Sequence, residues 1–325
     1  MASSDLLEPP NSLILHRSFS DVDWLAEVVS ARRQVCITQL SRDSLHCDLL
    51  LAEFDCFQFA FLESNCPLRF VGPKGSGWID FALPLQTTEQ YLVAHHTPIQ
   101  SDTLFGFDCH RENNVILPGN LKLGVFQTRT EILKNCVEVM DRLDIDQRFL
   151  ASNFLRCPTT VSTMQVYLRD LLWLVKYQPD FLTPAYVQRL ILEDFLPLLV
   201  SCIPPQNKKF IKPPAEFRRA HLVRQAEDYM IAHLDQPLTL KDLCYALNTS
   251  SRALSYGFQD VFGMSPMAYL KVLRLHGVHR TLRSADPAKT IIADIAAQFG
   301  FWSLGHFTHD YKKMFGQLPS ETLNR

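Results

Sequence analysis

The stretch from Asp294 to Pro319 reads DIAAQFGFWSLGHFTHDYKKMFGQLP and contains two short helical patterns joined at a glycine. Apolar residues recur at the spacing of one helix face at Ile291, Ile292, Ile295 and Ala296. Gly300 supplies the turn, because only glycine enters a left-handed conformation without steric cost. Ser303 stands where it would cap a second helix, whose buried stripe is Phe307, Tyr311 and Phe315. This order of residues predicts a helix-turn-helix unit.

A second unit lies upstream. Its first apolar stripe is Leu240, Leu243, Ala246 and Leu247, and its second is Leu254, Phe258 and Val261. Residues 248–250 (Asn-Thr-Ser) make the turn, and Thr239 with Asp242 resembles a capping box. Aligning Leu254 with Phe307 and Phe258 with Tyr311 gives a repeat of 53 residues in both cases. Two units in phase are much harder to attribute to chance than one.

The segment between the two units explains this spacing. Ser265 and Pro266 form a good helix start, and apolar residues then continue helically to about Ser284. Such a helix is roughly 25 Å long. Together with the units at its ends, it would hold two recognition helices about 34 Å apart, one turn of B-DNA. We therefore expect one chain to read two successive major-groove segments.

Residues of about 216–321 resemble the DNA-binding domain of the AraC/XylS family of bacterial transcription regulators. The residues that carry the resemblance are Leu243, Leu254, Phe258, Gly263, Ser265-Pro266, Tyr269-Leu270, Arg274-Leu275, Leu282, Ile295-Ala296, Gly300-Phe301, Ser303, Phe307, Tyr311-Lys312, Phe315-Gly316 and Pro319. The sequence departs from the family pattern at Gly305, at His309 and at Tyr256-Gly257, and each glycine weakens helix propensity by up to about 1 kcal/mol. The resemblance implies a sequence-specific DNA-binding transcriptional regulator, with an activator as the expected type.

The candidate base-reading residues are those that the buried stripes leave facing outward. In the first unit these are Ser251, Arg252, Ser255 and Tyr256, and in the second they are Leu304, Thr308, His309 and Lys312. Arg252 could bond a guanine edge with two hydrogen bonds, Thr308 and His309 would read bases, and Lys312 would bind phosphate. The alternatives are that Arg252 contacts only phosphate and that His309 is a surface histidine that touches nothing.

Charge and composition divide the chain. Residues 206–325 carry 16 Lys plus Arg against 10 Asp plus Glu, whereas residues 1–205 carry 16 against 24. A basic module favours phosphate contacts. Two proline pairs surround a basic stretch near residue 209 and indicate a semi-rigid linker. We expect a regulatory or dimerisation domain at 1–203, a linker at 204–215 and the DNA-binding domain at 216–325.

The sequence as a whole predicts an α+β chain. A β-rich barrel-like domain that carries helices comes first, and an all-α double helix-turn-helix domain follows it. Short β-rich runs and turns extend to about residue 127 and indicate a small barrel or sandwich, and the pattern is helical over 128–203. The faces at Ile132, Val139, Met140 and Leu143 look too apolar to be exposed. Leu168, Leu171, Leu172 and Val175 would either pack in the core or carry self-association. In the family such a domain senses an effector, dimerises, or does both.

The sequence gives little support for catalysis, for metal binding or for cysteine chemistry. Nine scattered cysteines without a Cys-x-x-Cys pair favour reduced thiols. We expect no catalytic residues, no metal site, no cofactor and no membrane span, hence a cytoplasmic protein. The expected partners are double-stranded DNA, a second copy of the chain, a small-molecule effector and, for an activator, RNA polymerase. The alternative class is an enzyme or small-molecule-binding barrel that carries a DNA-binding tether.

Overall fold

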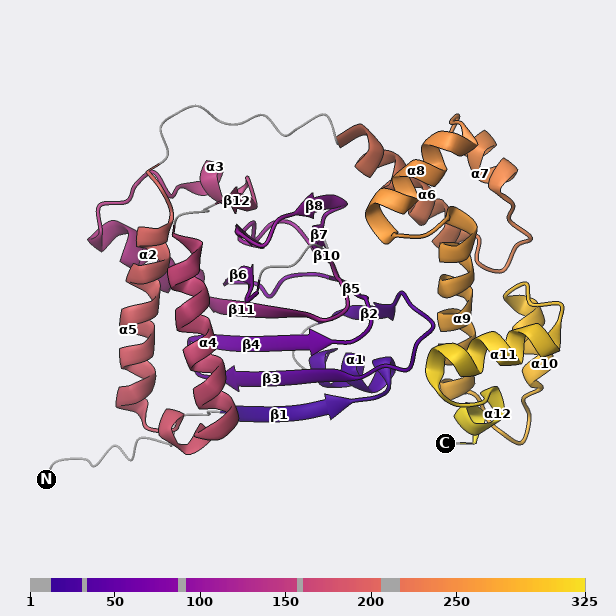
Figure 1. The fold of residues 1–325 in the computed structure, drawn as a ribbon, viewed down its shortest axis with the longest axis horizontal. Helices are drawn as coiled ribbons and strands as arrows, with labels where there is room; N and C mark the ends of the chain where they lie inside the picture. Colours follow the sequence, from indigo (N-terminus) through magenta and orange to yellow (C-terminus); the bar gives the residue numbers. More distant parts are fainter. Residues whose placement is uncertain (1–12, 31–33, 87–91, 157–159, 206–216, 325) are drawn as a thin grey trace, which may run out of the picture.

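Two β-sheets and a helical layer form the first part of the chain, and helices alone form the last part (Figure 1). The structure is a computed structural model that describes residues 13–30, 34–86, 92–156, 160–205 and 217–324. The α+β class and the order of a β-rich part before an all-helical part are as the sequence predicts. The predicted linker lies outside the described residues, apart from Pro204 and Pro205.

The described strands pair antiparallel in two sheets. The first sheet has the order β1-β3-β4-β11-β6-β9-β12 and the second has the order β2-β5-β10-β7-β8. The strand bounds are β1 Leu13–Phe19, β2 Cys36–Gln39, β3 Cys47–Glu53, β4 Phe57–Ser64, β5 Leu68–Gly72, β6 Trp78–Pro84, β7 Leu92–Ala94, β8 Thr97–Ile99, β9 Thr103–Phe105, β10 Asn113–Leu117, β11 Leu121–Arg129 and β12 Phe154–Arg156. Among the described strands no ladder joins the two sheets into a closed barrel.

The seven-stranded sheet is covered on both faces. Phe57, Phe59 and Phe61 alternate along β4 and point to one face, where Phe59 and Phe126 pack on Phe195 with ring centroids 5.3 and 4.4 Å apart. Phe195 belongs to helix α5 (Ala185–Cys202), which lies on this face with α4 (Val161–Tyr177) (Figure 1). The opposite face looks towards the second sheet.

The remaining helices of this part are short. They are α1 Val22–Ser30, α2 Thr130–Val139, α3 Gln147–Leu150 and the 3-10 helix η1 Pro179–Leu182. Strand β12 interrupts the region 128–203 that the sequence predicts to be helical, because its three residues pair with β9. Val139 and Leu143 are 88 and 70 % exposed, contrary to prediction, whereas Leu168, Leu171 and Val175 are buried in the core. Core packing is therefore the correct alternative for these three residues.

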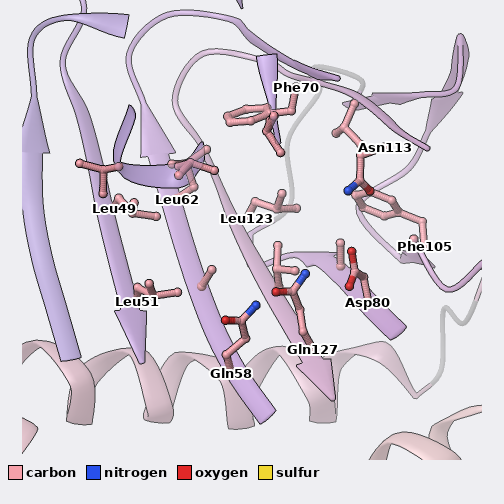
Figure 2. Close-up of a pocket in the computed structure, with 18 residues that line it drawn as sticks. Leu49, Leu51, Gln58, Leu62, Phe70, Asp80, Phe105, Asn113, Leu123 and Gln127 are labelled. Atoms are coloured by element: carbon pink, nitrogen blue, oxygen red, sulfur yellow. The ribbon is translucent and has the colours of Figure 1, made fainter. Parts of the chain in front are cut away.

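A cavity of about 190 Å³ lies between the two sheets (Figure 2). The first sheet contributes Gln58, Asp80, Leu123 and Gln127 among others, the second contributes Phe70 and Val115, and α1 contributes Val28 and Val29. The lining is mostly apolar, and the sequence did not reveal the cavity.

The C-terminal part contains seven helices within residues 217–324: α6 Phe217–Ala232, α7 Leu240–Ala246, α8 Ser251–Phe262, α9 Pro266–Ser284, α10 Ile292–Gln298, α11 Leu304–Phe315 and α12 Pro319–Leu323. They share one core, to which Val93 and Ile116 of the second sheet and Leu40, the residue after β2, also belong. In the described part of the chain no helix is long and apolar enough to cross a membrane.

Candidate DNA-binding surface

Helices α7 and α8 form the first helix-turn-helix unit. The backbone amide of Thr239 donates to Asp242 Oδ2 at 2.8 Å, and the amide of Asp242 donates to Thr239 Oγ1 at 3.3 Å, so the capping box is formed as predicted. The turn places Asn248 at φ 46°, a left-handed conformation that asparagine tolerates. The Ser250 hydroxyl then accepts from the amide of Ala253 and caps α8.

Helices α10 and α11 form the second unit with a turn one residue longer. Helix α11 starts and ends 53 residues after α8, whereas α10 starts and ends 52 residues after α7. Gly300 has φ 78° and occupies the same place after its helix as Asn248 does in the first unit. Ser303 holds the predicted N-cap position, but its side chain makes no capping hydrogen bond.

Both recognition helices end in the same way. Gly263 after α8 has φ 66° and Gly316 after α11 has φ 71°, and each is the left-handed residue that closes its helix. Leu254 and Phe307 are buried at equivalent positions, as are Phe258 and Tyr311. The structure thus repeats one supersecondary unit twice, in agreement with the repeat in the sequence.

Helix α9 holds the first unit through aromatic packing. Ser265 caps its start by accepting from the amide of Ala268 at 3.3 Å. The ring of Tyr269 stacks on Phe262 with a centroid distance of 4.0 Å and meets Phe258 edge-on at 5.6 Å. At about 1.5 Å per residue, the 19 residues of α9 span roughly 28 Å.

The second unit docks near the other end of α9. An added Cβ at Gly277 would lie 2.3 Å from Cε1 of Phe299, so the Phe299 ring packs directly on the α9 backbone. The His279 Nδ1 atom lies 2.5 Å from the hydroxyl of Tyr311, which in turn donates to Thr322 at 2.8 Å. Both units are therefore fixed to one helix, although the separation of about 34 Å stays a prediction.

The candidate readers of the first unit lie on one side of α8. Ser251, Arg252 and Tyr256 are exposed, and Ser255 is half-buried. The guanidinium of Arg252 lies over the Tyr256 ring, 5.4 Å from its centroid, and reaches the Tyr256 hydroxyl at 3.4 Å. This contact holds the Arg252 side chain against the helix while its charge remains accessible.

The candidates of the second unit are also accessible. Leu304, His309 and Lys312 are exposed and Thr308 is half-buried. Asp310 points away from this face, since it is buried and bonded by Arg42 at 2.7 Å and by Lys271. The sequence analysis missed Trp302, which is 80 % exposed in the turn before α11.

The sheets contact helices α6 and α9 of the C-terminal part through buried polar groups that the sequence did not predict. Arg69 of β5 donates to Glu227 Oε2 of α6 at 2.7 Å and to the Tyr269 hydroxyl at 2.8 Å. His96 lies 3.6 Å from the same carboxylate. Burial opposes ionisation of Glu227, but His96, Arg69 and Tyr269 together hold its pKa below the usual value.

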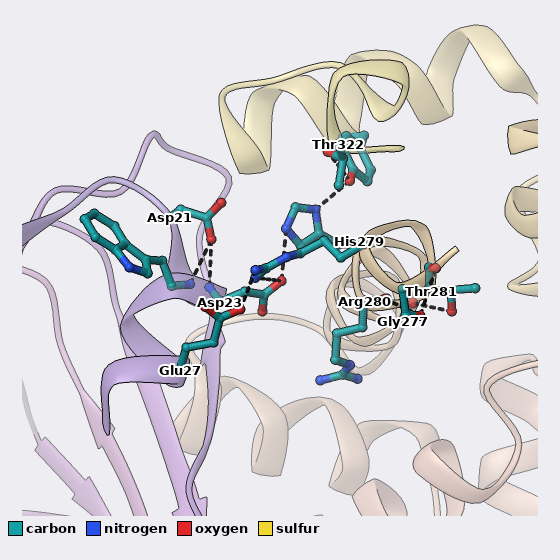
Figure 3. Close-up of polar contacts among 12 residues, drawn as sticks. Asp21, Asp23, Glu27, Gly277, His279, Arg280, Thr281 and Thr322 are labelled. Carbon is teal, nitrogen blue, oxygen red and sulfur yellow. Dashed lines mark hydrogen bonds and ion pairs between the residues drawn. The ribbon is translucent and has the colours of Figure 1, made fainter. Parts of the chain in front are cut away.

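A second polar contact joins α1 to α9 (Figure 3). Asp23 Oδ2 lies 3.0 Å from His279 Nε2 and 3.6 Å from Arg283, and Glu27 also bonds Arg283. Burial opposes ionisation of Asp23, but its hydrogen bond to His279 and the charges of His279, His276 and Arg283 lower its pKa on balance. His276 is buried, with Nε2 3.0 Å from the carbonyl oxygen of Gln39, and burial lowers its pKa to about 4.

Asp21, Asp23 and His279 each place one potential metal-ligand atom within 4.8 Å of the others. Asp21 accepts from the amides of Asp23 and Trp24 at 2.9 and 3.2 Å and so caps α1. Arg283 already brings positive charge to Asp23. These carboxylates thus serve the helix and the contact with α9.

Comparison with known proteins matches residues 243–325 to a family described as a helix-turn-helix domain. The "Probable thc operon regulatory protein" of Rhodococcus erythropolis is 41% identical over 102 residues, which are 31% of this chain and 31% of that protein. The "XylDLEGF operon transcriptional activator" of Pseudomonas putida is 30% identical over 93 residues, 29% of each chain. The chain thus spans about a third of the length of these curated relatives.

Among solved structures, a probable AraC family transcriptional regulator from Rhodopseudomonas palustris is 42% identical to this chain. The match covers 32% of this chain and 96% of that one, with a TM-score of 0.30. The relatives and the matched family model agree with the resemblance drawn from the sequence. Residues 243–325 carry a helix-turn-helix domain, and this part of the chain is similar to the AraC family regulator.

Proposed function

We propose that this chain is a sequence-specific DNA-binding transcriptional regulator that reads two successive major-groove segments. The observation that carries the proposal is the pair of equivalent units on α9, each presenting an exposed face of its second helix. The relatives described as an operon regulatory protein and an operon transcriptional activator support it through the DNA-binding part.

The proposed roles follow from position and side-chain chemistry. Arg252 would bond a guanine edge, with Ser251, Ser255 and Tyr256 beside it on α8. On α11, Thr308 and His309 would read bases next to Leu304, and Lys312 would bind phosphate. The excess of positive charge in residues 206–325 would add binding that depends on salt.

An activator requires contact with RNA polymerase, and we propose this partner together with a cytoplasmic site of action. We also propose that the cavity between the sheets accepts a small-molecule effector. It is mostly apolar with a few buried polar side chains, which is typical of a ligand site.

We further propose that the chain forms a homodimer. The contact would be made by the outer face of α4 and not by the leucines of α4 that are buried in the core. Val166, Trp173 and Tyr177 are 49, 51 and 61 % exposed, and their spacing of seven and four residues puts them on one face of α4. In Figure 1, α4 lies on the side of the sheets opposite the DNA-binding helices, so two copies could pair there without covering α8 or α11.

Selection of binding sequences from a random duplex library by the full chain tests the main proposal. The expected result is an enriched motif of two elements whose centres lie about 10 base pairs apart. The matched controls are Lys312→Ala, which should weaken binding on all sequences, and Arg252→Ala, which should relax one position. Enrichment of no sequence would reject the proposal and favour the alternative, a small-molecule-binding protein or enzyme with a general DNA tether.

A further inference from the structure

The two recognition helices differ most in their first turns. With the repeat of 53 residues, Leu304 of α11 occupies the place of Ser251 in α8. Gly305 likewise occupies the place of Arg252. The first turn of α8 thus presents a hydroxyl and a guanidinium, whereas the same two places of α11 present an isobutyl group and no side chain. These places of α11 offer a base edge no side-chain hydrogen bond.

Trp302 precedes this turn and is exposed for a structural reason. The amide of Phe301 donates to the carbonyl oxygen of Ala296 at 2.9 Å, and the Phe301 ring packs on buried Phe307 with a centroid distance of 5.1 Å. Phe301 is anchored in this way, and Trp302, the next residue, is 80 % exposed. Trp302 and Leu304 therefore put two exposed apolar side chains at the start of α11, where the first unit has a threonine and a serine.

DNA is the occupant that the surroundings of this apolar pair favour. Leu304 and Thr308 are one helical turn apart, so the leucine continues the predicted reading face of α11. Lys312 and Lys313 are exposed in the last turn, while Asp310, the one carboxylate of this helix, is buried and paired with cations of the sheet part and of α9. The start of α11 lies farther from the sheets than its end (Figure 1). A polyanion can therefore reach it.

The base-edge group that suits an apolar side chain is the C5 methyl of thymine. A cytosine at the same place would bury its amino group against Leu304 without a hydrogen-bond partner, which is unfavourable. Gly305 helps the approach, because an added Cβ there would have no atom within 4 Å and the helix backbone beside Leu304 is open.

We propose that the second unit selects a thymine through contact of its C5 methyl with Leu304, and that Trp302 packs its indole on the deoxyribose beside that base. This inference rests on the proposed function, because it names a base that α11 reads within the two-element site. The units then read DNA by different chemistry, α8 through the hydrogen bonds of Arg252 and the start of α11 through apolar contact. The indole N–H of Trp302 remains able to donate to a phosphate oxygen at the edge of the groove.

Deoxyuridine in place of thymine tests the base contact, because it removes only the methyl group and keeps the base pair. Fluorescence anisotropy measures the affinity of the full chain for labelled duplexes that carry the selected two-element site, with thymines replaced one at a time. The element in which Arg252→Ala relaxes a position is bound by α8, so the other is bound by α11. One replacement in the α11 element should weaken binding about fourfold, the value of burying one methyl group. Leu304→Ser, which copies the first unit, should bind both duplexes equally while its circular dichroism matches that of the parent chain.

The fluorescence of Trp302 tests the second contact. The chain has four tryptophans, and the duplex should protect an indole of the parent chain, but not of Trp302→Phe, from quenching by acrylamide. Trp302→Ala should weaken binding at least about fivefold on the thymine and deoxyuridine duplexes alike. If Trp302→Ala instead changes the mass of the free chain in solution and leaves DNA binding unaltered, Trp302 meets another protein copy and the contact with deoxyribose is wrong.

Failure of this inference differs from failure of the proposed function. A selected two-element motif whose α11 element lacks thymine, or tolerates deoxyuridine at every position, overturns the thymine contact and leaves the function standing. Selection of no motif rejects the proposed function, and the thymine contact with it.

Discussion

Two glycines in helices of the DNA-binding part should respond to alanine with opposite signs. In an unobstructed helix interior, Gly→Ala stabilises by about 1 kcal/mol, because alanine loses less backbone entropy on folding. Gly305 of α11 has no atom within 4 Å of its added Cβ. Gly305→Ala should therefore raise the free energy of unfolding by up to about 1 kcal/mol.

Gly277 of α9 is different because Phe299 packs against it. The added Cβ would lie 2.3, 2.8 and 3.0 Å from Cε1, Cδ1 and Cζ of Phe299, whereas carbon atoms prefer about 3.5–4.0 Å. The ring must move by roughly 1 Å, and such overpacking costs about 1–3 kcal/mol. After the helix-propensity gain, Gly277→Ala should lower the free energy of unfolding by about 1 kcal/mol.

Urea unfolding of the full chain, followed by circular dichroism, compares the two variants. The decisive comparison introduces Gly277→Ala into the Phe299→Leu variant. Because the ring is then absent, Gly277→Ala should be neutral or stabilising there. Since Phe299 docks the second unit on α9, Gly277→Ala should also weaken binding to a two-element site more than to a single element. If Gly277→Ala stabilises the parent chain as Gly305→Ala does, the close approach is refuted.

Three further predictions concern the two DNA-reading units and the contact between α9 and the sheets. Arg252→Ala should relax preference at one base position by about 1–3 kcal/mol in competition binding, and equal weakening on all sequences would instead indicate a phosphate contact. Val272→Pro, in the middle of α9, should cost about 3 kcal/mol or more locally and reduce affinity for the two-element site to that of one unit, whereas unchanged binding would mean that the units act independently. Acid should weaken the contact between the sheets and α9, as read by hydrogen exchange of α9 amides. The pKa of His276 is depressed to about 4, so its contribution is complete above about pH 6.5 and is lost as the pH falls towards 4. If the α9 amides lose more protection from exchange in His276→Gln than in the parent chain over this pH range, His276 is not the group whose titration weakens the contact.

The sequence predicted the helix-turn-helix units well because their determinants are local. The capping box at Thr239, the N-cap at Ser250 and the left-handed glycines at 263 and 316 each act within a few residues. The repeat of 53 residues then placed the two units in phase. The candidate readers face outward for the same reason, although their contact with bases stays a prediction.

What the sequence missed depends on residues far apart along the chain. Arg69 and Glu227 are 158 positions apart, so neither shows its partner in a sequence pattern. Strand β12 has three residues and forms only because β9 offers an edge. Gly277 looks like a weak point in a helix until Phe299 is placed against it. Val139 and Leu143 satisfied an apolar pattern and yet lie exposed, because periodicity alone does not say what covers a face.

Helix α9 combines local sequence determinants with contacts to residues far away along the chain. Tyr269 and Gly277 face the two DNA-reading units, whereas His276 and His279 extend to the sheet part at Gln39 and Asp23. Because nearly every side of α9 is occupied, its sequence lacks the single apolar stripe of a surface helix. Substitutions on α9 should therefore separate into two classes. Those towards the units should change how DNA is read, and those towards the sheets should change how cavity occupancy alters that reading. His279 contacts both Tyr311 and Asp23, so its replacement should disturb both properties at once.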